Sequence, residues 1–108
     1  MKLIVAIVDL EDEEHATELL NQSGFFVTRL STRGGWFKKT NSTLLIGTED
    51  DKVEKALSIL KESAGKKEFD VKMPLPSGKT SASLNQSIHA KSGGCTTFVL
   101  SLDKMVKL

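Results

Sequence analysis

The residues best suited to binding chemistry gather in the stretch RGGWFKKTN, residues 33–41. Gly34 and Gly35 tolerate positive φ and let the backbone approach a ligand closely, and successive amides in such a turn form a concave anion site. Trp36 or Phe37 offers a flat face on which a nucleobase stacks. Because neighbours on an extended chain point in opposite directions, one ring stacks and the other anchors the segment. The stretch therefore predicts a site for an anionic ligand that carries a base.

Polar residues on both sides of these glycines fit the same kind of ligand. Lys38 and Lys39 bring positive charge, and the carboxamide of Asn41 has the geometry that pairs two edges of adenine. Thr28 adds a hydroxyl group. Each feature also has an ordinary structural explanation, since Gly-Gly is most often a turn and Trp36 would equally cover a contact between subunits. Their concentration within the 14 residues from Thr28 to Asn41 favours the binding site.

Catalytic and metal-binding patterns are missing from the sequence. The chain has two distant histidines, His15 and His89, and a single cysteine, Cys95, so no metal-ligand spacing occurs. We expect His15 to be a solvated surface residue and Cys95 to be a small buried apolar residue rather than a nucleophile. Neither a nucleophile-elbow motif nor a phosphate-loop motif is present. The sequence therefore predicts a protein that is not an enzyme and that uses no metal or cofactor.

Size and composition indicate one globular domain over residues 1–108. The formal net charge of +1 gives no bulk attraction to a nucleic-acid polymer or to acidic lipid, so any anion site must be local. No apolar run approaches the roughly 18 residues that a membrane span needs. The apolar start is short and ends in acids, unlike a signal peptide, and the lone cysteine agrees with a reducing compartment. We expect a cytoplasmic location.

The elements that must position these residues follow the order β-α-β-β-α-β. Apolar runs predict strands at 3–8, 25–31, 42–47 and 95–102. Helical periodicity predicts helices between Asp9 and Gly24 and over 53–64. This order is ferredoxin-like and predicts an α+β fold, in which an antiparallel sheet carries two helices on one face. Residues 68–73 alternate weakly as a further short strand, and flexible loops are expected at about 32–42 and 74–94.

Two other protein classes share this element order and fit the residues less well. An RNA-recognition module needs aromatic side chains on its central strands, and the first strand has none. An acylphosphatase-like enzyme needs an arginine-bearing phosphate loop directly after the first strand. The sequence VDLEDEE, residues 8–14, places acids there instead, and these would repel such a substrate.

The first strand is apolar on both sides, but two helices on one face of a sheet can cover only one of them. Leu3, Val5 and Ile7 point one way, and the residues between them point the other way. Apolar area left in water costs about 25 cal/mol per Å². We therefore expect a homo-oligomer that buries the second face of the sheet. The alternative is that the C-terminal segment or the long loop folds across that face.

Five stretches of the sequence together resemble a known family. They are MKLIVAIV at the start, FVTRLSTRGGWF, NSTLLIG, DDKVEKAL in the second helix, and GGCTTFVL near the end. This combination resembles the PII-like cyclic-di-AMP receptors of the PstA/DarA type over nearly the whole chain. The combination is far more specific than a lone glycine motif.

The resemblance implies a homotrimer that binds cyclic-di-AMP in clefts between subunits. An adenine would pack on Trp36, and Asn41 would read its edge. No catalysis is known for the family, and ligand binding is thought to rearrange the loops so that a partner protein is recognised. The positions of this chain that match the family's ligand-binding residues are Thr28, Gly35, Trp36, Phe37, Asn41, Gly47, Gly93 and Gly94.

The chain departs from the family pattern at several ligand positions. Phe26 stands where the pattern has an arginine that meets a phosphate, Trp36 and Phe37 replace phenylalanine and leucine, and Thr40 replaces a glycine. Candidates for the phosphate contact are Arg29, Arg33, Lys38 and Lys39. The alternative function is that of a PII-like relative that has lost cyclic-di-AMP binding and binds another nucleotide or only protein partners.

Overall fold

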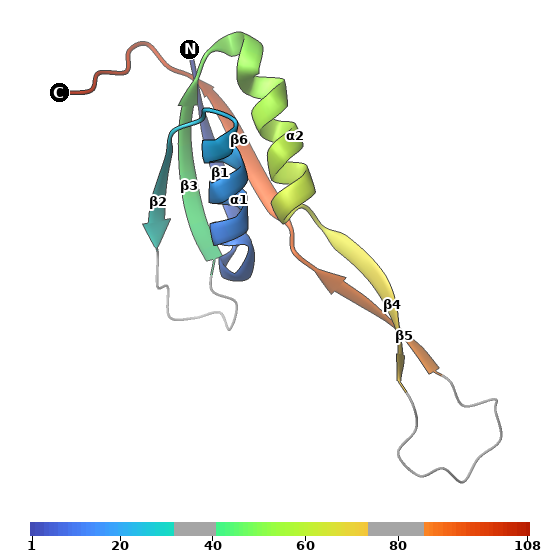
Figure 1. Ribbon diagram of the computed structural model, residues 1–108. Helices are drawn as coiled ribbons and strands as arrows, with labels where there is room; N and C mark the ends of the chain where they lie inside the picture. Colours follow the sequence, from blue (N-terminus) through green and yellow to red (C-terminus); the bar gives the residue numbers. More distant parts are fainter. Residues whose placement is uncertain (32–40, 74–85) are drawn as a thin grey trace, which may run out of the picture.

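A four-stranded antiparallel sheet carries the fold, and the computed structural model describes the chain over residues 1–31, 41–73 and 86–108. The strands of this sheet are β1 (Lys2–Asp9), β2 (Val27–Ser31), β3 (Asn41–Thr48) and β6 (Cys95–Ser101). Their spatial order is β2-β3-β1-β6, and β1 pairs antiparallel with both β3 and β6 (Figure 1). This arrangement confirms the predicted α+β class and is compatible with a ferredoxin-like fold.

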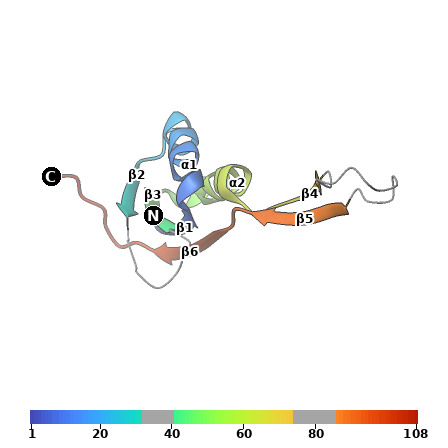
Figure 2. The same cartoon turned by 90° about the horizontal axis from the view of Figure 1, so that it is seen from below.

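Two helices cover one face of this sheet, as predicted from the sequence. They are α1 (Leu10–Gln22) and α2 (Val53–Ala64), and a short 3-10 turn, η1 (Asp50–Lys52), leads into α2. Figure 2 shows both helices on the same side of the sheet. Neither helix, nor any other among the described residues, is long and apolar enough to cross a membrane.

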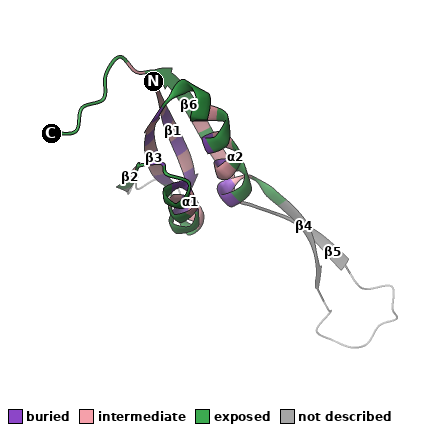
Figure 3. Ribbon diagram, turned by 45° about the horizontal axis from the view of Figure 1, so that its top comes forward, coloured by how far each residue is buried: buried purple, intermediate pink, exposed green. Residues whose placement is uncertain are grey.

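The buried core lies between the helices and the facing side of β1 and β3, where the buried residues gather in Figure 3. Strand alternation turns Ile4, Ala6 and Val8 toward the helices, and each is at most 1% exposed. Leu3, Val5, Ile7 and Asp9 lie on the opposite side, called here the helix-free face, and they are only half-buried. The full core comprises Ile4, Ala6, Val8, Ala16, Leu20, Phe25, Leu44, Ile46, Ala56, Leu60 and Ala64.

An antiparallel hairpin separates α2 from β6 and forms a second, two-stranded sheet. It consists of β4 (Lys67–Met73) and β5 (Gln86–Ser92), and it extends away from the four-stranded sheet (Figure 1). The loop expected at about 74–94 is therefore wrong for residues 86–92, whereas the strand predicted at 42–47 is confirmed as β3. The polar sequence of β5 has no clear apolar period that would predict a strand. Its extended backbone is instead stabilised by antiparallel pairing with β4.

A glycine pair joins the hairpin to β6 and packs against the end of α2. Gly93 and Gly94 have φ of +76° and +129°, in a region that favours glycine. The amide of Gly94 donates a hydrogen bond to the carbonyl of Ala64 at 3.0 Å. A Cβ on Gly93 would lie 2.6 Å from the carbonyl oxygen of Gly65, so no side chain fits there. The two glycines therefore fix the point at which the chain enters β6.

Gly93→Ala is expected to destabilise the fold more than the matched control Gly24→Ala. Both residues have positive φ, but an added Cβ at Gly24 meets nothing within 4 Å. The control isolates the backbone term of about 1–2 kcal/mol, and the contact at Gly93 should add a further ~1–3 kcal/mol. Urea unfolding at one protein concentration measures both variants. Equal losses would show that the Gly65 contact relaxes without cost.

Candidate functional site

Several residues predicted to bind a ligand lie at one end of the sheet, where β1 finishes. Asn41 opens β3 opposite Asp9, and Cys95 opens β6 opposite Val8. Gly93 and Gly94 immediately precede this end of β6. The start of β3 and the start of β6 therefore lie at the same end of the sheet (Figure 1).

Thr28 and Asn41 share the helix-free face. Thr28 lies in β2 opposite Leu45 and is exposed, and Asn41 is exposed at the start of β3. Alternation along β3 puts Asn41 on the same side as Leu45, away from the buried Leu44. The two polar residues that the sequence assigns to ligand reading are thus accessible from one side of the sheet.

Gly47 lies toward the opposite end of β3 and is not brought together with Asn41 within one chain. The six positions from 41 to 47 correspond to roughly 20 Å of extended strand. Gly47 pairs with Leu3, and a Cβ on Gly47 would lie 2.7 Å from the sulfur of Met105. One face of Gly47 is therefore in contact with the C-terminal segment of its own chain.

Arg29 lies on the helix side of β2, where it meets an acid. Its guanidinium Nη1 is 3.3 Å from Oε1 of Glu13 on α1. The Glu13 side chain is only 11% exposed, whereas that of Arg29 is 51% exposed. Arg29 is therefore placed on the face opposite to Thr28, although it was predicted as a phosphate contact together with three residues of the neighbouring segment.

The remaining predicted site residues lie outside the described residues. They are Arg33, Gly35, Trp36, Phe37, Lys38 and Lys39. Their roles in stacking, phosphate contact and backbone contact stay predictions.

His15 and Cys95, the candidates that the sequence offers for catalysis or metal binding, have environments typical of structural residues. His15 is exposed on α1. Cys95 is half-buried beside the core, and burial raises the pKa of its thiol, which keeps it protonated and poorly nucleophilic at neutral pH. Among the described residues, no group of three or more His, Cys, Asp or Glu side chains is placed to hold a metal ion.

Sequence reasoning overlooked a set of contacts made by the C-terminal segment, residues 102–108. The ammonium of Lys107 lies 3.2 Å from the centre of the Phe26 ring, and the amide of Leu102 donates a hydrogen bond to the carbonyl of Met1 at 3.1 Å. With the contact between Met105 and Gly47, these place the segment across the end of the helix-free face. From the sequence, only the alternative that the C-terminal segment folds across the second face of the sheet came near these contacts.

The comparisons with known proteins agree over the whole chain. The family model described as "Cyclic-di-AMP receptor" matches residues 1–108. Among solved structures, the chain is similar to a functionally unknown protein from Pediococcus pentosaceus ATCC 25745, with 28% sequence identity and a TM-score of 0.76. That match covers 99% of this chain and 96% of the other. Because the family match spans every residue, the chain belongs to the cyclic-di-AMP receptor family.

Proposed function

We propose that this protein is a PII-like signalling protein that binds cyclic-di-AMP in clefts between the subunits of a homotrimer. Binding would rearrange the segments beside the cleft, and a partner protein would recognise the change without any catalytic step. The observation that carries the proposal is the match of the complete chain to the cyclic-di-AMP receptor family. The geometry of the protomer supports its two further parts, the shared site and the assembly.

The separation of the predicted ligand residues supports a site shared between chains. Asn41 and Gly47 stand at the two ends of β3, roughly 20 Å apart along the strand. Asn41 lies beside the segment that carries Trp36, whereas Gly47 lies beside the C-terminal segment. If these residues contact one cyclic dinucleotide at close range, Asn41 of one subunit must meet Gly47 of another.

The helix-free face supports self-association. Leu30, Phe98 and Leu100 are 43%, 52% and 48% exposed, and Leu45 and the outer residues of β1 are half-buried. These side chains occupy neighbouring positions on β2, β3, β1 and β6. Burying such a face against other subunits would gain about 25 cal/mol per Å² of apolar surface.

The residue roles within the proposed site follow the chemistry of the ligand. Trp36 provides the stacking face for adenine, and Asn41 with Thr28 reads polar groups. The backbone at Gly35 and Gly47 permits close approach, because these residues carry no Cβ. The phosphates would be met by Arg33, Lys38 or Lys39, since Arg29 is paired with Glu13 on the other face.

Titration calorimetry with cyclic-di-AMP, ATP and cyclic-di-GMP tests the function. We expect saturable heat with cyclic-di-AMP and little with the other two nucleotides, because the asparagine pairs with adenine and the site is shaped for a cyclic dinucleotide. Binding of ATP or cyclic-di-GMP in its place would favour the alternative that another nucleotide is sensed. If none of the three nucleotides gives heat, the remaining alternative is a protein that binds only protein partners.

Trp36→Ala is expected to weaken cyclic-di-AMP affinity and leave the thermal unfolding midpoint nearly unchanged. Loss of one base-stacking face removes about 1–3 kcal/mol, or roughly 5- to 150-fold in affinity. Calorimetry and thermal unfolding on the same preparation separate the two effects. A sharp drop in stability with unaltered affinity would make Trp36 an architectural anchor.

Phe98→Glu is expected to break the trimer, because it places a charge in the centre of an apolar contact. Leu10→Glu is the matched control, since Leu10 is similarly exposed, at 47%, on α1 and away from the helix-free face. Sedimentation velocity should give three times the protomer mass of 11.8 kDa for the wild type and the control, and a lower mass for Phe98→Glu. A wild-type protein that sediments as a single protomer at micromolar concentration would overturn the proposed assembly.

A further inference from the structure

We propose that the C-terminal segment, residues 102–108, presents Lys107 to a phosphate of the bound nucleotide, a role that rests on the proposed function. Lys107 would be an additional ligand-binding residue, brought from the far end of the chain to the face that carries Thr28. Phe26 would act as its positioning residue.

The segment is attached to the sheet by a backbone contact and by a side-chain contact. The hydrogen bond from Leu102 to Met1 continues the pairing of β6 with β1 by one residue beyond Ser101. Met105 then packs on the bare backbone of Gly47, so close that a Cβ there would clash with its sulfur. These contacts hold the segment over the end of β3 on the helix-free face.

The contact with Phe26 places the Lys107 ammonium at the same end of the helix-free face. The pairing of Val27 with Ile46 puts Phe26 next in register opposite Gly47. The Phe26 ring is 68% exposed, and the Lys107 ammonium lies over its face, where the electron-rich ring attracts a cation. This contact does not neutralise the ammonium, which has three N–H donors and no hydrogen-bond or ion-pair partner among the described residues.

The position of Lys107 agrees with a phosphate contact. Phe26 and Thr28 are two residues apart, which is roughly 7 Å along an extended chain and returns to the same face. Arg29, between Thr28 and Leu30, points the other way and pairs with Glu13. The structure therefore puts the positive charge of Lys107 over Phe26, on the face that carries Thr28 and opposite to the face of Arg29.

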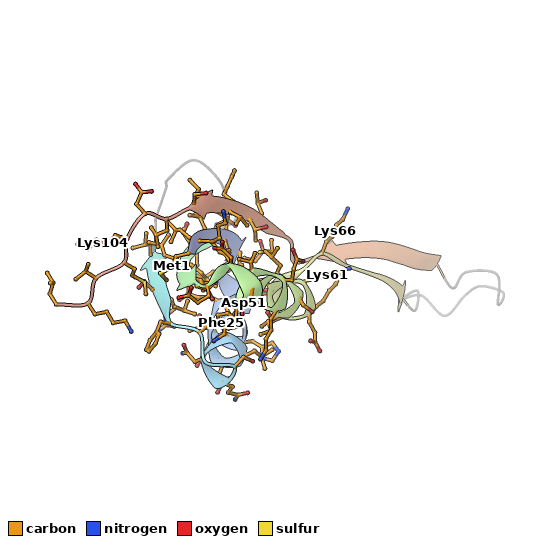
Figure 4. All side chains as sticks on the ribbon, turned by 90° about the horizontal axis from the view of Figure 1, so that it is seen from above. Met1, Phe25, Asp51, Lys61, Lys66 and Lys104 are labelled. Atoms are coloured by element: carbon orange, nitrogen blue, oxygen red, sulfur yellow. The ribbon has the colours of Figure 1, made fainter. Side chains whose placement is uncertain are left out.

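Figure 4 views the molecule from the end at which this segment lies. It labels Phe25 on the helix side of the sheet and Lys104 on the segment that leaves β6. Lys104 is exposed, and within the described residues it has no aromatic contact, unlike Lys107. Lys104 is therefore a control for the general effect of removing one positive charge from the same segment.

The test compares cyclic-di-AMP titrations of the wild type, Lys107→Met and Lys104→Met at low and moderate salt. Methionine keeps an unbranched apolar side chain but removes the charge. A lost charge-assisted phosphate contact should weaken binding roughly tenfold or more, and the remaining affinity should depend less on salt. Lys104→Met should stay within about twofold of the wild type. Lys107→Arg should retain most of the affinity.

A double-mutant cycle tests whether Phe26 positions the lysine. Phe26→Leu removes the aromatic face but keeps an apolar side chain, so it should weaken binding when Lys107 is present. In the Lys107→Met background the same change should have little further effect, because the charge it positions is gone. Additive losses would overturn the positioning role of Phe26.

The outcomes separate this proposal from the proposed function. If the wild type gives no heat with cyclic-di-AMP, the proposed function fails and the role of Lys107 fails with it. If the wild type binds and Lys107→Met binds equally well, the function stands and the role of Lys107 is overturned. Tighter binding by Lys107→Met would also overturn it, because the segment would then obstruct the site.

Discussion

The hydrophobic effect acts on both faces of β1, but α1 and α2 cover only one of them. Ile4, Ala6 and Val8 are buried under the helices, whereas the alternate residues of the same strand are half-buried on the helix-free face. Among the described residues, no further helix lies on the other face. The uncovered face is where a second subunit can pack and where the C-terminal segment already lies. Under the proposed function, one packing constraint would therefore link assembly and ligand binding.

Strand alternation also divides the polar residues of β2 between two roles. Arg29 faces α1 and pairs with the nearly buried Glu13, so its charge is used within the fold. Thr28 faces the other side, where a ligand can reach it. Around the helix-side pair, the buried oxygens of Glu13 Oε2, Thr17 Oγ1 and Ser42 Oγ have no hydrogen-bond partner within the described part of the chain.

The glycines that the family resemblance assigns to ligand contact also have structural roles within the protomer. Gly93 and Gly94 take conformations that favour glycine and set the entry of β6, and Gly47 leaves space for Met105. These contacts within the chain already require glycine, whatever further contact a ligand makes. Phe26, which departs from the family pattern, has a comparable double character. The resemblance places an arginine at this position, and the Phe26 ring here contacts the ammonium of Lys107 instead.

The sequence by itself determined the order of the main elements, the two-sided character of β1 and the family resemblance. These depend on local apolar periodicity, on turn residues and on short motifs, all of which are readable along the chain. Only the tertiary structure decided that residues 86–92 form a strand, that Arg29 faces Glu13, and that Lys107 meets Phe26. The physical reason is that these features depend on partners distant in sequence. A polar strand is stabilised by the backbone of its neighbour, and contacts between the two ends of a chain exist only once the sheet has brought them together.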